Sequence, residues 1–129
     1  MSLDVGHLLE NGEHECRLQF HDDGYYWFLH AWFVQVKKTT GKYVDLYGDA
    51  QFHESNGLAM LRAAMSEALE TARRQPREWQ VHTGTQLRPV RQELYATVKR
   101  SNLVNMISKF LALIEETQAS GKTLAFLGD

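Results

Sequence analysis

Four residues capable of acid–base chemistry lie close together in the sequence: Asp45, Asp49, His53 and Glu54. We expect them where a strand gives way to a helix, and loops held by such a scaffold often carry functional groups. A histidine titrates near neutral pH, and a neighbouring carboxylate can orient its ring. Acidic side chains also stabilise the N-terminus of a helix. Two interpretations therefore stay open: a small catalytic or ligand-binding site, and simple helix capping.

The signatures of cofactor and metal chemistry are missing from the sequence. It contains no GxGxxG or GxxxxGK[ST] phosphate loop, no GxSxG elbow, no HExxH and no CxxC. His14 and Cys16 would share one side of a strand, but Cys16 and His21 differ by five positions and would face opposite sides. Zinc needs three or four ligands within tetrahedral reach. We therefore predict neither a metal ion nor a cofactor.

An aromatic run, residues 25–34, is the most distinctive segment of the sequence. Aromatic and β-branched side chains favour strands, so we predict a strand over residues 25–37. Apolar residues occupy both its even and its odd positions, whereas a strand with one solvated face alternates apolar with polar residues. A helical layer, a partner subunit or a ligand must therefore cover the second face.

The odd-numbered side of this predicted strand is the surface on which we expect a partner. If the helices cover the other face of the sheet, this side keeps a contiguous apolar patch, and such patches mark interaction sites. Aromatic residues of a neighbouring strand, expected over residues 43–47, would extend the patch. The predicted interface comprises Tyr25, Trp27, Leu29, Phe33, Tyr43 and Tyr47.

The rest of the chain divides into alternating and helical patterns. Alternation predicts strands over residues 16–20, 43–47 and 79–82, and an apolar run predicts a covered strand over 123–127. Apolar residues at spacings of three and four predict two amphipathic helices, which begin near residues 55 and 101. Residues 90–99 fit a strand or a helix, and their unbroken polar alternation favours the strand. Residues 1–14 are expected to form a loosely packed terminal segment.

These elements predict one α+β domain over residues 1–129, in the order βββ-α-ββ-α-β. The simplest architecture is an antiparallel or mixed sheet of about five or six strands with both helices on one face. The length of 129 residues suits a single domain with a real hydrophobic core.

Composition and charge narrow the class of protein further. The net charge is −2, yet residues 73–100 hold seven Lys or Arg against two Asp or Glu. An acidic chain is a poor candidate for nucleic acid, because neutralisation of phosphates dominates that affinity. One cysteine excludes an internal disulfide, and the start of the chain lacks a secretory signal pattern. The longest apolar run is about half of a membrane span. We expect a cytoplasmic protein that does not enter membranes.

The function that we predict from the sequence is a small non-enzymatic binding or accessory domain. Its expected partner is another protein or a second copy of itself, through the aromatic sheet face. The alternative is a small enzyme or ligand-binding domain that uses the acidic and histidine cluster, and a small-molecule ligand remains compatible with it.

Overall fold

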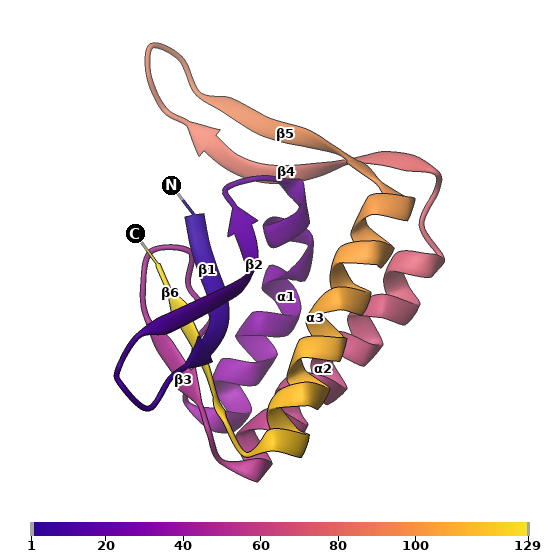
Figure 1. The fold of residues 1–129 in the computed structure, drawn as a ribbon. Helices are drawn as coiled ribbons and strands as arrows, with labels where there is room; N and C mark the ends of the chain where they lie inside the picture. The colour runs from indigo at the N-terminus through magenta and orange to yellow at the C-terminus, as the bar shows by residue number, and fades with distance from the viewer. Residues whose placement is uncertain (1, 129) are drawn as a thin grey trace.

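The computed structural model describes residues 2–128, which form three helices and six strands (Figure 1). In chain order these are β1 (Ser2–Leu8), β2 (His14–His21), α1 (Gly24–Thr40), β3 (Ala50–Phe52), α2 (Ser55–Arg73), β4 (Glu78–Gln86), β5 (Gln92–Lys99), α3 (Arg100–Ser120) and β6 (Thr123–Leu127). The predicted α+β class is confirmed, but the order differs from the predicted one because an additional helix follows the first two strands. No helix within residues 2–128 is long and apolar enough to cross a membrane.

Four strands form one antiparallel sheet in the order β2-β1-β6-β3. The prediction that residues 123–127 form a covered strand is confirmed, since β6 lies between β1 and β3. The prediction of a loose segment over residues 1–14 is wrong for residues 2–8, which form the inner strand β1. One face of β1 packs on the core, because Leu3, Val5 and His7 are fully buried. Met1 and Asp129, the ends of the predicted domain, lie outside the described residues.

The aromatic segment is a helix, and the prediction of a strand over residues 25–37 is wrong. The Asp23 carboxylate caps α1 by accepting hydrogen bonds from the first-turn N–H groups of Tyr25 and Tyr26, at 3.0 and 3.3 Å. Gly41 ends the helix in the left-handed conformation, with φ of 76°. Between these caps, the buried side chains recur at helical spacing: Tyr26, Leu29, Phe33 and Val36. The second apolar side of the segment is partly covered, because the rings of Phe28 and Trp32 pack against each other at a tilt and Phe28 contacts Trp79 of β4.

The segment that follows α1 is an irregular connection rather than a strand. Residues 43–47, predicted as a strand, carry no strand assignment, and the short strand β3 comes later in the chain. Val44 and Leu46 of this connection are still buried. The short strand β3 pairs with β6, at the far end of the chain, rather than with β2.

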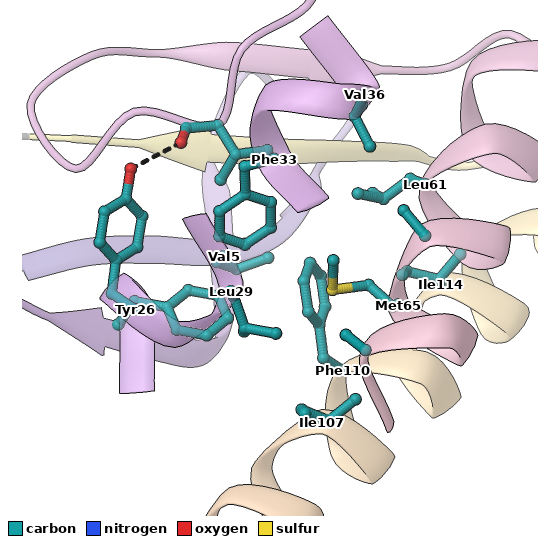
Figure 2. Close-up of a cluster of buried hydrophobic side chains, with 14 of the residues drawn as sticks. Val5, Tyr26, Leu29, Phe33, Val36, Leu61, Met65, Ile107, Phe110 and Ile114 are labelled. Atoms are coloured by element: carbon teal, nitrogen blue, oxygen red, sulfur yellow. Dashed lines mark hydrogen bonds between the residues drawn. The ribbon is translucent and has the colours of Figure 1, made fainter. Parts of the chain in front are cut away.

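The core lies between the sheet and the three helices, which Figure 1 shows on one side of the sheet. The predicted helices correspond to α2 and α3, and Figure 2 shows their side chains Met65 and Phe110 facing Phe33 of α1. The rings of Phe20 and Phe110 meet edge to face with their centroids 5.4 Å apart. The Phe110 ring also meets the ring of Phe126 edge to face, with a centroid distance of 6.0 Å. Strands and helices thus meet in one continuous hydrophobic cluster.

Strands β4 and β5 form a separate two-stranded antiparallel ribbon. The strand interpretation of residues 90–99 is confirmed for residues 92–99, and the predicted strand over 79–82 extends from 78 to 86. Trp79 and Val98 anchor the base of the ribbon in the core. Residues 83–86 are also part of β4, so the ribbon continues beyond the core and projects from the body in Figure 1.

A buried histidine connects the sheet to α3. His7 is fully buried, and its Nε2 lies 2.9 Å from the hydroxyl of Thr117, whose single proton is donated to the Leu113 carbonyl at 2.7 Å. Thr117 must therefore accept a hydrogen bond from His7 Nε2, and His7 Nδ1 is buried without a partner. Burial lowers the pKa of His7, opposed by the nearby carboxylate of Glu116. Burial thus favours the neutral imidazole over the charged one.

Candidate functional site

The four predicted acid–base residues divide between two hollows. Asp45 and Asp49 line a shallow hollow of about 350 Å³, formed by residues 41–51. His53 lines a separate hollow of about 130 Å³ beside Thr117, and its Nδ1 lies 3.1 Å from the hydroxyl of Thr123. Glu54 stands directly before α2 and makes no side-chain capping bond. The structure therefore pairs the two aspartates but does not bring His53 or Glu54 into their hollow.

Both aspartates hold the local backbone in place. Asp45 accepts a hydrogen bond from the N–H of Tyr47 at 3.1 Å, which closes a turn. Asp49 accepts one from the N–H of Gly128 at 3.0 Å, so it ties the connection before β3 to the end of β6. The backbones of Gly128 and Gly48 approach so closely that a Cβ at position 128 would overlap Gly48. These contacts fix the position of the exposed side chain of Tyr47.

A histidine–tyrosine pair holds residues 43–47, the connection after α1, against that helix. The Nε2 of His30 in α1 lies 2.6 Å from the hydroxyl of Tyr43, and the hydroxyl of Tyr26 donates to the Val44 carbonyl at 2.8 Å. Burial lowers the pKa of His30, partly offset by the charge of Asp45. A neutral His30 fits a structural role, because it pins residues 43–47 against α1 without introducing a buried charge.

The predicted interface residues do not share one surface. Leu29 and Phe33 are fully buried in the core, so the expectation of an exposed aromatic sheet face is wrong. The helical turn of α1 separates residues that would alternate on a strand. Tyr25, Trp27 and Tyr43 are half-buried, and Tyr47 is 49% exposed.

Two of these aromatic residues converge on one carboxylate. The indole N–H of Trp27 donates to Asp22 Oδ1 at 2.7 Å, and the hydroxyl of Tyr47 donates to Asp22 Oδ2 at 3.2 Å. Asp22 therefore joins α1 to the connection that carries the hollow. Burial and the neighbouring carboxylates raise the pKa of Tyr47, which keeps its hydroxyl a donor.

Several acidic side chains and Leu127 are connected to Tyr47 by hydrogen bonds, close backbone contacts or strand pairing. Leu127, which is 37% exposed, stands next to Gly128 and pairs in register with Asp4 across β1 and β6. We call this surface the acidic patch; its members are Asp4, Asp22, Asp45, Asp49, Tyr47 and Leu127. It combines four carboxylates with two exposed hydrophobic side chains.

The second surface lies on the β4–β5 ribbon. Four of the seven large hydrophobic side chains that are exposed within residues 2–128 belong to it: Leu87, Val90, Leu94 and Tyr95. Leu87 and Val90 are the most exposed, at 72% and 67%, and they flank a cis peptide bond between Arg88 and Pro89. We call residues 82–95 the hairpin arm. The alternation of residues 90–99 predicts a strand here, but it does not predict that the apolar side chains face solvent.

Side-chain hydrogen bonds connect the two strands of the arm. Glu93 of β5 receives hydrogen bonds from His82 Nε2 at 2.5 Å and from the hydroxyl of Thr85 at 2.9 Å. These bonds, that of Thr85 first, lower the pKa of Glu93. The hydroxyl of Thr83 donates to the Leu94 carbonyl at 3.3 Å. The arm is therefore ordered by its own cross-strand contacts although it projects beyond the core.

Within residues 2–128, no three His, Cys, Asp or Glu side chains are arranged to hold a metal ion. Comparison with models of protein families, with curated proteins and with solved structures gave no match to this chain. The function has to be inferred from the two surfaces themselves.

Proposed function

We propose that this chain is a non-enzymatic protein-binding domain whose principal contact element is the hairpin arm. The observation that carries the proposal is the gathering of exposed Leu87, Val90, Leu94 and Tyr95 on one projecting element. Single exposed apolar side chains are common on monomeric proteins, whereas a concentration of them on one element is a feature of interaction sites. The other exposed hydrophobic side chains are spread over the body, at Tyr47, Met60 and Leu127.

The chemistry of the arm suits a protein partner. Burying a side chain of the size of Leu87 or Val90 stabilises a complex by about 1.5–3 kcal/mol. Tyrosine and arginine are enriched at the energetically important centres of interfaces, and the arm offers Tyr95 together with Arg88 and Arg91. Among the described residues Arg88 forms no ion pair, so its guanidinium is available to a partner.

The cross-strand bonds of the arm favour binding for a second reason. A flexible segment loses conformational entropy when it docks, whereas an ordered one has already lost most of it. The contacts of Glu93 with His82 and Thr85 order the ribbon in the free chain. The free energy gained by burying the apolar side chains of the arm is therefore offset less by the entropy cost of ordering it.

Position-specific photocrosslinking tests the proposal. A photo-reactive amino acid replaces Leu87 in the full chain, and the matched control carries it at Ser108, an exposed position of α3. We expect a protein adduct from position 87 and none from position 108. A second change, Tyr95→Glu, should suppress the adduct because it places a charge in the contact. If neither position 87 nor position 90 yields a protein adduct, the proposal is wrong.

A further inference from the structure

We propose that the partner of the hairpin arm is a second copy of this chain: each copy places its arm on the acidic patch of the other. This inference rests on the proposed function and names the partner. It also commits to a reciprocal arrangement, in which two identical contacts form around a twofold axis.

The first observation is the separation of charge along the chain. Residues 73–100, which include the whole ribbon, hold seven Lys or Arg and two Asp or Glu. The remainder holds seven Lys or Arg and fourteen Asp or Glu. Within the arm itself the basic groups are Arg88 and Arg91 near its tip, against one carboxylate, Glu93. These two arginines are complementary in charge to the carboxylates of the acidic patch on a second copy that lies antiparallel to the first.

The second observation is that both surfaces combine charge with exposed apolar groups. At the tip of the arm, each exposed apolar residue is followed by an arginine: Leu87 by Arg88, and Val90 by Arg91. The acidic patch surrounds Tyr47 and Leu127 with carboxylates. Apolar groups can thus pack at the centre of the contact while arginines and carboxylates pair around them, which is the usual anatomy of an interface.

The size of the arm favours a reciprocal contact over a single one. A stable interface uses roughly 20–30 residues on each side. The arm, residues 82–95, supplies about half of that number. When both arms dock, each copy contributes its arm and its acidic patch, and the interface reaches the usual size. The closed twofold arrangement also leaves no unused arm to continue a filament.

The experiment measures the mass of the full chain in solution by sedimentation equilibrium across micromolar concentrations. The chain has a mass of 14.9 kDa, so the expected species is a dimer of twice that mass. The arm variant Arg88→Glu/Arg91→Glu should weaken self-association by about a hundredfold or more, because like charges placed in contact cost several kcal/mol. The patch variant Asp4→Lys/Asp49→Lys should do the same.

Mixing the two variants separates lost complementarity from damaged folding. In a mixed dimer, the acidic arm of the first variant meets the basic patch of the second, and the unaltered arm and patch meet as well. Each variant should therefore be monomeric alone and dimeric in the mixture. The control Arg62→Glu/Lys109→Glu reverses two charges on α2 and α3, and it should remain a dimer. If mixing fails to restore the dimer, the inference is wrong.

Other outcomes distinguish this inference from the proposed function. If the chain is monomeric and position 87 crosslinks to a different protein, the second copy is the wrong partner, but the protein-binding function stands. If position 87 crosslinks to nucleic acid, shown by an adduct that nuclease removes, both proposals are wrong. If the chain is a dimer whose mass the arm variant leaves unchanged, the association uses another surface and the inference is overturned.

Discussion

Replacing Phe33 with alanine should destabilise the fold severely, because this ring lies where α1 meets the rest of the core. Phe33 is fully buried, and its ring centroid lies 5.6 Å from that of Tyr26, 6.1 Å from Phe20 and 6.5 Å from Phe110. Removal of a buried phenylalanine ring forfeits its transfer free energy and leaves a cavity, at a cost of about 3–5 kcal/mol. A whole domain is stable by only about 5–15 kcal/mol, so this single change removes a large share of the stability.

The measurement is urea denaturation followed by far-ultraviolet circular dichroism. Phe33→Leu keeps most of the volume and should cost less than about 1.5 kcal/mol, which provides a folded variant if Phe33→Ala unfolds. Ala31→Ser is the matched control on the same helix; Ala31 is exposed, so the change should cost about 0.5 kcal/mol in helix propensity. A Phe33→Ala variant within about 0.5 kcal/mol of the native chain would refute the buried helix, since surface positions behave in that way.

Three further changes test other parts of the fold by the same denaturation assay. Because the pKa of His7 lies below its ordinary value of 6.5, the unfolded chain takes up the proton first, so the free energy of unfolding should fall as the pH drops below that value. His7→Gln should make the free energy of unfolding less dependent on pH, and an unchanged pH profile in this variant would contradict the role of His7. Asp23→Ala removes the cap of α1 and should cost about 1 kcal/mol; no loss would mean that the cap is dispensable. Gly6→Ala places a Cβ onto the Glu15 carbonyl and should cost about 1–3 kcal/mol, while Gly84→Ala, which meets open space, should cost less. Equal costs at the two glycines would contradict the close approach of β1 and β2.

The helices α2 and α3 and the strand β6 could be predicted because their local patterns agree with their surroundings. The apolar residues of α2 recur at helical spacing and face one core, while its other side is solvated. Gly121 ends α3 in the left-handed conformation with φ of 70°, the place where glycine is favoured after a helix. In such elements the periodicity of the sequence carries most of the structural information.

The aromatic segment was predicted wrongly because burial on several sides removes periodicity. Leu29 and Phe33 face the central core, while Phe28 and Trp32 pack toward Trp79 of the ribbon. Apolar residues at both even and odd positions correctly indicate that more than one side of the segment is covered. The aromatic content, by contrast, favours a strand where the chain forms a helix. The signals that favour a helix were the caps at its ends: Asp23 before the segment and Gly41 after it, with two lysines in the last turn.

The candidate site could be predicted only in pieces, because exposure is a tertiary property. The sequence indicates Asp45 and Asp49 as candidate acid–base residues and Tyr47 as a candidate interface residue. It does not indicate that Asp4 pairs with Leu127, more than 100 residues later, or that Asp49 binds the N–H of Gly128. The polar alternation of residues 90–99 predicts a strand, and the apolar side of such a strand usually packs on a core. Val98 at the base follows this rule and is fully buried, whereas Leu94 nearer the tip is 38% exposed.

The difference between the base and the tip of the ribbon follows from its length. Strand β4 covers nine residues, or about 30 Å at the usual rise per residue, whereas its contact with α1 involves its first few residues. On β5 the apolar alternation from Val98 to Leu94 runs past the end of the core, whereas β4 is polar or glycine at residues 82–86. Leu87 and Val90 lie in the loop between the two strands, where they are the most exposed large apolar side chains of the described residues. The core therefore holds only the base of the ribbon, and its exposed end carries Leu87 and Val90 beside the charges of Arg88 and Arg91.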